Sequence, residues 1–215
     1  MWLKKSLSFV RKLLFFGATS FFLGCSFFNR YDEMEFRRDY DIEMAYFIWE
    51  KEGEGRSIPY FRSNFPASLY YALRGKDDSA LYYFNKSSSD RKEEEIEKIL
   101  KRIYVSPHIH SFSFDEKFKY VMEGIEMARK KRMKGLVVDG FLMLTFLTNH
   151  YGPDISFVDS AFKYSKTHYD YQKIKGILDY ITPKVEDYGK YVELYFKVTK
   201  KIEKTRPKCK KGICD

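Results

Sequence analysis

The sequence contains few residues that interrupt regular structure. Its 215 residues include only 12 Gly and 6 Pro, whereas aromatic residues make up 19% of the chain, with 20 Phe and 18 Tyr. A chain with so many large side chains can bury a substantial hydrophobic core, and this composition is not that of a disordered protein. The length suffices for one domain or two small ones.

The motifs that identify common enzyme classes are also missing. The chain has no Gly-rich phosphate-binding loop, no Gly-x-Ser-x-Gly elbow, no His-Glu-x-x-His and no paired zinc knuckles. We therefore expect no cofactor and assign no catalytic residue. This absence favours a binding protein over an enzyme.

Net positive charge is small outside the two ends of the chain. The formal net charge is +9, but four basic residues lie in Met1–Lys12 and eight lie in residues 197–211. The rest of the chain is close to neutral, so we expect no nucleic-acid-binding surface on the folded domain. The basic C-terminal segment is either a contact for anionic lipid or an acidic partner, or a solvated helix end.

The N-terminus has the pattern of a secretory signal. After the basic segment, Leu13–Gly24 carries no charge, and the run Phe22-Leu23-Gly24-Cys25 follows. This run resembles the lipobox of bacterial lipoproteins, although Phe22 stands where Leu is usual. The resemblance implies cleavage after Gly24 and a diacylglycerol on the Cys25 thiol. Two or three acyl chains would hold the protein stably on a membrane.

An uncleaved signal anchor is the alternative to lipidation. The apolar segment would then be Leu13–Phe28, which is 16 residues long, whereas a membrane span needs roughly 17–25 residues. Both interpretations export the domain to the cell envelope. With a lipobox, Ser26 after the cysteine implies sorting to an outer membrane where the cell has one.

The sequence suggests four segments. Residues 1–24 are the signal peptide, residues 25–33 are the lipidated cysteine and a tether, residues 34–204 are a helical domain, and residues 205–215 are a basic tail. The tail contains Cys209 and Cys214, and in an exported protein such a pair suggests a disulfide. Two reduced thiols are the alternative.

Apolar residues recur at helical spacing through most of the domain, so we predict an all-α fold, either a bundle or a short stack of antiparallel helical hairpins. Leu136–Thr148 is apolar nearly all round and should be the central buried helix. Ser113 and Glu116 form a capping box that begins the helix before it. In the helix after Asp90, the pairs Glu94–Lys98 and Glu97–Lys101 are expected on the exposed face.

One stretch of the domain, residues 68–87, has the pattern of a helical repeat. Small and aromatic residues occur where two antiparallel helices would touch: Ser68, Tyr71, Gly75, Ala80, Phe84 and Ser87. The stretch resembles the core of a tetratricopeptide repeat, which implies a tight helical hairpin in a stacked array. The usual proline after the second helix is replaced by Lys92, and no second copy follows. An ordinary helical hairpin is therefore the alternative.

Two groups of residues are candidates for chemistry. His108 and His110 would point the same way in an extended loop and could share a metal ion, with Asp115 or Glu116 supplying an oxygen ligand. Asp139 is the only charged residue within the apolar helix, and a buried carboxylate often marks a functional site. It could equally pair with a lysine or cap a neighbouring helix.

We predict from these features a membrane-anchored envelope lipoprotein that acts as a protein-binding or scaffolding module. By resemblance, its role would lie in envelope assembly or secretion, with another envelope protein as partner and an oligomeric state that the sequence leaves open. Such a module should expose an aromatic groove. The alternative is a cell-envelope hydrolase that uses Asp139 or the His108/His110 pair, and pairing of Asp139 with a lysine in a dry core would remove its main support.

Overall fold

The structure is a computed structural model, and it describes residues 63–87, 91–149, 152–181 and 187–206, together with two short backbone strands in the tail. The predicted signal peptide, the lipidation site Cys25 and the tether lie outside the described residues. Side chains are described neither for residues 91–93 nor for the tail beyond residue 206.

The prediction of an all-α fold is confirmed. The described residues form eight α-helices: α3 (Asn64–Leu73), α4 (Asp77–Asn85), α5 (Arg91–Leu100), α6 (Phe114–Lys130), α7 (Lys134–Thr148), α8 (Ile155–Tyr164), α9 (His168–Tyr180) and α10 (Tyr188–Thr205). None of the helices in this described part is long and apolar enough to cross a membrane.

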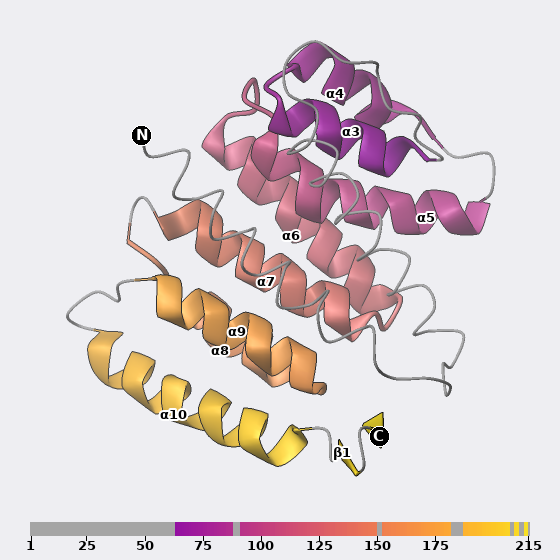
Figure 1. The fold of residues 1–215 in the computed structure, drawn as a ribbon. Coiled ribbons are helices and arrows are strands. Elements are labelled where there is room, and N and C mark those ends of the chain that lie inside the picture. The colour runs from indigo at the N-terminus through magenta and orange to yellow at the C-terminus, as the bar shows by residue number, and fades with distance from the viewer. Residues whose placement is uncertain are drawn as a thin grey trace.

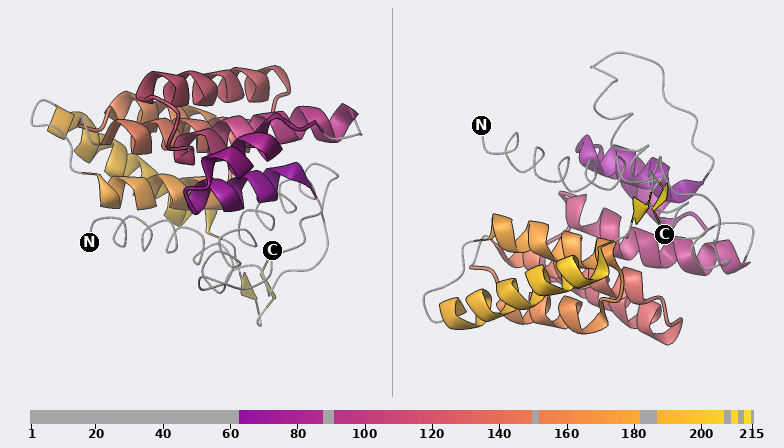
Figure 2. Two further views of the ribbon diagram at one scale, coloured as in Figure 1. Left: turned by 90° about the horizontal axis from the view of Figure 1, so that it is seen from above. Right: turned by 60° about the horizontal axis from the view of Figure 1, so that its bottom comes forward.

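The helices pack on one another largely in chain order. Figure 1 shows α3 and α4 at the top of the stack, α6 and α7 in the middle and α10 at the bottom. Each helix from α6 to α10 contacts the next one along the chain, and α3 packs closely against α4. The right-hand view of Figure 2 also shows α3–α4 and α10 on opposite sides of the helical stack. Helical hairpins stacked in sequence therefore build the domain.

The central helix α7 is buried as the sequence predicts. Nine of its residues are buried: Leu136, Val137, Val138, Asp139, Gly140, Phe141, Leu142, Leu144 and Thr145. It contacts α6 and α8 on its two sides and also touches α9. A helix surrounded in this way needs no polar face, which is why its apolar residues show no helical period.

The start of α6 confirms the predicted capping box. The Ser113 hydroxyl accepts a hydrogen bond from the Glu116 backbone N–H at 3.2 Å, and the Glu116 carboxylate accepts one from the Ser113 N–H at 2.7 Å. A second capping box, formed by Thr167 and Asp170, begins α9. The two boxes satisfy backbone donors that the first turn of a helix leaves free.

Helix α5 continues into a wider π-helical turn, η2 (Lys101–Val105), and a 3-10 turn, η3 (Ser106–His108). Pro107 explains the change, because its ring would clash with the carbonyl four residues earlier in an α-helix and it has no N–H to donate. The Ser106 N–H instead donates to the Lys101 carbonyl, five residues back. The π-turn carries Tyr104, whose hydroxyl reaches α7.

The expectation that Glu97 and Lys101 lie on an exposed helix face is wrong. The two residues are only 6% and 3% exposed. Glu97 Oε1 accepts a hydrogen bond from the Phe65 N–H at 2.6 Å, and Lys101 Nζ donates to the Lys86 carbonyl at 2.7 Å. The α3–α4 hairpin thus covers this flank of α5, and the charged side chains bind backbone groups that the ends of α3 and α4 leave without helical partners.

Helix α10 ends at Thr205, and two strands of two residues follow, β1 (Cys209–Lys210) and β2 (Ile213–Cys214). This antiparallel pair was not predicted from the sequence. Its register places Cys209 opposite Cys214 and Lys210 opposite Ile213.

Candidate functional site

Three helical segments bring a charged cluster together at the middle of the stack. Lys173 on α9 donates to Asp139 Oδ1 on α7 at 2.7 Å, and the hydroxyl of Tyr104 on η2 donates to Asp139 Oδ2. The side chains of Asp139 and Lys173 are only 6% and 12% exposed. Lys173 Nζ also lies 4.3 Å from the centre of the Tyr169 ring, one turn earlier on α9. The carboxylate therefore has a donor on each oxygen.

Close packing of α6 against α7 fixes the position of this cluster. A Cβ atom added at Gly140, next to Asp139, would lie 2.4 Å from the Ile125 side chain on α6. At Gly124 on α6, an added Cβ atom would lie 2.8 Å from the side chain of Ile103 on η2. These glycines allow α6 to approach both neighbours, so the backbones that carry Asp139 and Tyr104 are held at a fixed distance.

The cluster is built to hold helices together more than to act on a substrate. A carboxylate that accepts from a lysine and a tyrosine in a buried position is not poised to take a proton from a bound molecule. Removing one partner of such a pair would leave a buried charge uncompensated, which typically costs about 3–5 kcal/mol. The pairing with Lys173 removes the main support for the hydrolase alternative.

The two histidines lie in a turn and not in an extended loop. His108 ends the 3-10 turn η3 and is half-buried, and its pKa is lowered to about 4 by burial and by the positive charges of Lys117 and His110. His110 is exposed, and its Nδ1 lies 3.7 Å from Asp77 Oδ1. Across the described ranges, no three His, Cys, Asp or Glu side chains are grouped so that they could hold a metal ion. Glu116 is occupied as a helix cap.

Asp77 fastens the loop that carries His110 to the start of α4. Its carboxylate accepts hydrogen bonds from the backbone N–H groups of His110, at 3.1 Å, and of Ser111. Burial would raise the pKa of Asp77, but these hydrogen bonds and the nearby His110 outweigh burial and lower it. The structure therefore gives His110 and Asp77 a part in joining the α3–α4 hairpin to the chain before α6.

The repeat-like residues lie at or near the contact between α3 and α4. Ser68 and Ala80 are fully buried, and the Ser68 hydroxyl donates to the Ala80 carbonyl at 2.8 Å. Gly75 has a φ of +68°, which favours glycine in the turn. Tyr71 stacks on Tyr83 with ring centroids 5.6 Å apart.

The other two repeat-like positions behave differently from each other. The Phe84 ring packs edge-on against the rings of Phe112 and Tyr120, which lie outside the α3–α4 hairpin, with centroid distances of 6.0 and 5.6 Å. Ser87 is exposed. The stretch is a tight helical hairpin, and its likeness to a tetratricopeptide repeat stays a resemblance.

The backbone of the tail is compatible with the predicted disulfide. Cys209 and Cys214 are direct partners across β1 and β2. Opposed residues in an antiparallel pair have Cα atoms roughly 4.5–5.5 Å apart, which is within the range that a disulfide bridges. Their side chains lie outside the described residues, so the bond stays a prediction.

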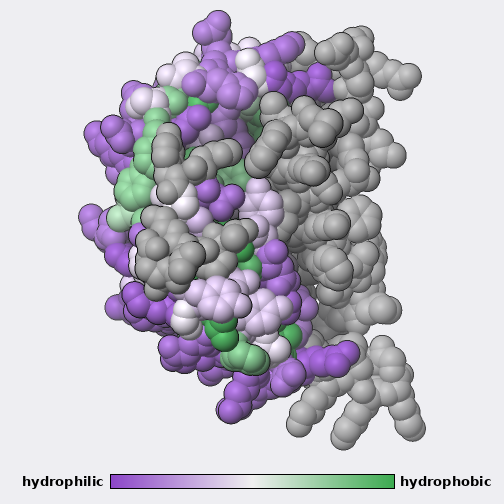
Figure 3. Space-filling model, turned by 90° about the vertical axis from the view of Figure 1, so that its left-hand side faces the viewer, coloured by the Kyte–Doolittle hydropathy of each residue, from purple (hydrophilic) through white to green (hydrophobic). Residues whose placement is uncertain are grey.

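Four large apolar side chains are exposed in the described part of the domain: Tyr82 at 60%, Phe114 at 36%, Tyr188 at 60% and Phe196 at 70%. Figure 3 shows apolar atoms on one side of the molecule in small groups separated by polar ones. Two of the four, Tyr188 and Phe196, belong to α10. The described residues therefore show scattered exposed rings rather than one continuous groove.

Four aromatic residues of α10 make up what we call the aromatic row: Tyr188, Tyr191 and Tyr195, whose rings follow one another, and Phe196, the next residue along the helix. Neighbouring tyrosine rings in it have centroids 6.3 and 6.1 Å apart. The Tyr191 hydroxyl donates to the Leu178 carbonyl at 2.9 Å, and Lys175 Nζ donates to the Tyr195 hydroxyl at the same distance. The two inner tyrosines are thus fixed on α9, and the rings at the two ends face solvent.

The sequence missed several of these roles. It singled out Asp139, but nothing in the local pattern pointed to Lys173, which is 34 residues away, or to Tyr104, which is 35 residues away. The spacing of Tyr188, Tyr191 and Tyr195 is a signal that could have placed them on one helix face, although it could not have told which edges of the rings are exposed.

Comparison of the chain with protein-family models, with curated proteins and with solved structures gave no match. The function must therefore be argued from the residues themselves.

Proposed function

We propose that this protein is a membrane-anchored envelope lipoprotein whose helical stack binds another protein, in envelope assembly or secretion. The observation that carries the binding role is the aromatic row on α10, the last helix of the stack. The exposed rings of Tyr188 and Phe196 stand on a helix whose other tyrosines are hydrogen-bonded in place.

Such a row suits a protein partner for two physical reasons. Aromatic residues are enriched in protein interfaces because they bury much area while losing few rotatable bonds. Rings that are already fixed in the free protein lose little further entropy on binding. Stacks of helical hairpins also bind peptides or helices along their exposed surfaces.

The anchor is supported by the lipobox-like run that ends at Cys25. Metabolic labelling with alkyne-palmitate in a bacterial host, followed by intact mass, tests it directly. We expect a labelled protein that begins at Cys25, and no label in the Cys25→Ala variant. An unlabelled wild type that still begins at Met1 would contradict the lipoprotein assignment and leave the signal anchor.

The binding role is tested by site-specific photo-crosslinking in the same host. A photoreactive residue at position 196 should give one discrete crosslinked species, and the Tyr188→Ala substitution should reduce its yield. Position 82 on α4 is the matched control, because Tyr82 is as exposed as Tyr188 but lies at the other end of the stack. Equal yields from positions 196 and 82 would remove the aromatic row as the binding site.

A further inference from the structure

Three segments that are separate in the sequence meet at one end of the helical stack, and all of them are basic. They are the α6–α7 turn, the α8–α9 connection and the last turn of α10. In Figure 1 the α6–α7 turn and the end of α10 both lie at the right-hand end of their helices. Their exposed basic residues define what we call the basic edge: Arg132, Lys134, Lys166, Lys201, Lys204 and Arg206.

Contacts between side chains show that the edge is continuous. The side chains of Lys134 at the start of α7 and Lys166 before α9 are neighbours, and their interaction lowers the pKa of Lys134. Two residues after Lys166, His168 Nδ1 lies 3.2 Å from the Thr205 hydroxyl at the end of α10. The edge therefore crosses from α7 to α10 without a gap.

Four lysines of this edge have no ion-pair partner within the described part of the domain. Some lysines elsewhere on the surface pair with carboxylates, as in Lys98–Glu94, Lys163–Asp159 and Lys197–Glu193. No described carboxylate forms an ion pair with the edge lysines Lys134, Lys166, Lys201 and Lys204.

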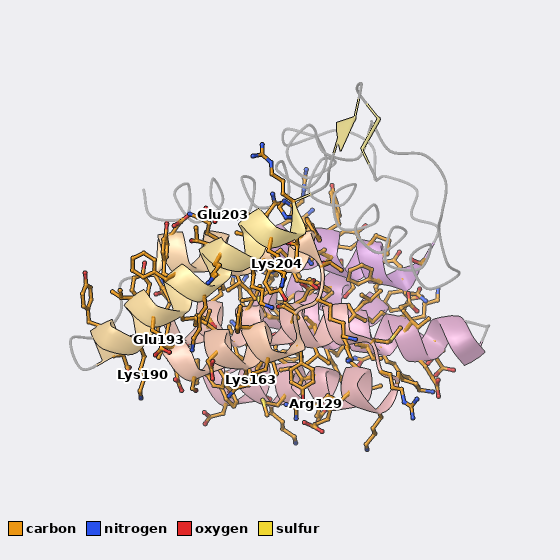
Figure 4. The ribbon with its side chains drawn as sticks, turned by 90° about the horizontal axis from the view of Figure 1, so that it is seen from below. Arg129, Lys163, Lys190, Glu193, Glu203 and Lys204 are labelled. Atoms are coloured by element: carbon orange, nitrogen blue, oxygen red, sulfur yellow. The ribbon has the colours of Figure 1, made fainter. Side chains whose placement is uncertain are left out.

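Two acidic residues near the edge, Asp170 and Glu203, lower its positive charge but form no ion pair with its lysines. The Asp170 carboxylate accepts hydrogen bonds from the backbone N–H groups of Lys166 and Thr167, both at 3.1 Å. Glu203 lies beside Lys204 at the end of α10, as Figure 4 shows, and forms no ion pair with it. The contact between Lys134 and Lys166 lowers the pKa of Lys134, as expected of two cations held together without an anion.

We propose that the basic edge lies on an anionic membrane surface, with its lysines and arginines against the phosphate groups of acidic phospholipids. Clusters of four to eight basic residues bind such surfaces because each adds a similar increment of attraction. Three more basic residues, Lys208, Lys210 and Lys211, follow Arg206 in the sequence. None of the four exposed aromatic residues belongs to this edge, which favours a broad charged surface over a peptide groove. This inference rests on the proposed function only in taking the protein to be at a membrane.

The test uses the full chain, incorporated by detergent removal into vesicles of phosphatidylcholine or of an equimolar mixture with phosphatidylglycerol. Exposed lysines are acetylated, and the rate at each one is read by mass spectrometry. We expect labelling of Lys134, Lys166 and Lys204 to be at least about threefold slower on the acidic vesicles. High salt should restore the rate, because the screening length falls from about 10 Å at 0.1 M to about 3 Å at 1 M.

Lys119 and Lys190 are controls in the same sample, since both are exposed: Lys119 lies in the first half of α6 and Lys190 in the first turn of α10, whereas the basic edge is at the other end of both helices. Their rates should not depend on the lipid. The matched variants are Lys134→Glu/Lys166→Glu and Lys119→Glu/Lys190→Glu, which change the net charge equally. Only the first should abolish the protection of Lys204.

Flotation of the same vesicles separates this inference from the anchor. Flotation with both lipids and equal labelling of the edge would keep the anchor and overturn the membrane-facing edge. Flotation only with acidic vesicles, lost in salt, would support the edge and overturn the anchor, and no flotation at all would overturn both. Equal protection by soluble polyglutamate would assign the edge to an acidic protein and overturn the lipid assignment.

Discussion

The described part of the domain contains two buried carboxylate–lysine pairs, and the two pairs join different parts of the fold. Asp139 and Lys173 come from helices far apart in the chain, and each is the other's direct ionic partner at 2.7 Å. Glu97 and Lys101 lie one turn apart on the same helical run, at the looser distance of 3.6 Å. Their shorter contacts are to the backbone, with the Phe65 N–H and the Lys86 carbonyl. The first pair joins α7 to α9, whereas the second closes the ends of the α3–α4 hairpin.

This difference decides how each pair should respond to substitution. A pair whose members depend on each other loses most when one member is removed. A pair whose members bind backbone groups retains part of its contacts when its charge is removed, because a neutral polar side chain can still accept or donate.

The largest effect is expected from Asp139→Leu. It leaves the Lys173 ammonium buried without its carboxylate, so we expect the free energy of unfolding in urea to fall by about 3–5 kcal/mol. The double variant Asp139→Leu/Lys173→Met should recover most of this loss, because both charges are then gone. A double variant as unstable as the single one would show that the pair itself is not what the helices require.

The next largest effect is expected from the half-buried His108, whose pKa is lowered mainly by burial. The pKa of His108 is about 4 in the folded protein, against 6.5 for an ordinary histidine. The unfolded chain binds the proton more tightly, so this contribution is present above pH 6.5 and is lost as the pH falls from 6.5 to 4. The expected loss is about 3 kcal/mol.

Urea unfolding measured across this pH range checks the histidine prediction. The His108→Gln variant should lack the loss between pH 6.5 and 4, whereas His110→Gln, a change at the exposed neighbour, should keep it. Identical profiles for His108→Gln and the wild type would contradict the burial of this ring.

A smaller effect is expected from Glu97→Gln. The glutamine carbonyl can still accept from the Phe65 N–H, but Lys101 loses the only carboxylate that lies within 4 Å of it among the described residues. We expect a loss of about 2 kcal/mol, as for weakening a charged buried contact while part of it remains. Glu97→Leu should cost more than Glu97→Gln, and equal costs would show that the helix-end hydrogen bond does not matter.

The smallest effect is expected at the Glu94–Lys98 pair, and it separates the effect of burial on stability from the effect of residue spacing. Glu94 and Lys98 have the same spacing on the same helix as Glu97 and Lys101 and lie 2.6 Å apart, but the Lys98 side chain is 47% exposed. Lys98→Ala should therefore change stability by only about 0.3–0.5 kcal/mol. A cost close to that of Glu97→Gln would mean that burial does not distinguish the two pairs.

Sequence reasoning succeeded where neighbouring residues decide the structure. The capping box at Ser113 and Glu116 needs only residues three apart, and the buried helix α7 is visible as an apolar run, Leu136–Thr148, whose only charge is Asp139. It failed for Glu97 and Lys101, because their burial depends on a hairpin that begins more than 30 residues earlier. The π-turn was also missed, although Pro107 marks its end in the sequence.

In the Asp139 cluster and in the contact between the His110 loop and α4, the sequence identified one residue but not the residue that it pairs with. It singled out Asp139 and His110, while Lys173 and Asp77 were not recognised. The basic edge was noticed only as a C-terminal tail. The part formed by Lys134 and Lys166 belongs to two turns that the fold brings together.

By itself, then, the sequence determined that the domain is helical, which helix is buried and where α6 begins. Helix period and capping act over about three to five residues, and such patterns can be read along the chain. Only the tertiary structure decided which charges are buried, which lysine meets Asp139 and that the basic turns share one edge. These outcomes depend on which helices lie side by side, and that arrangement follows from packing the whole core at once.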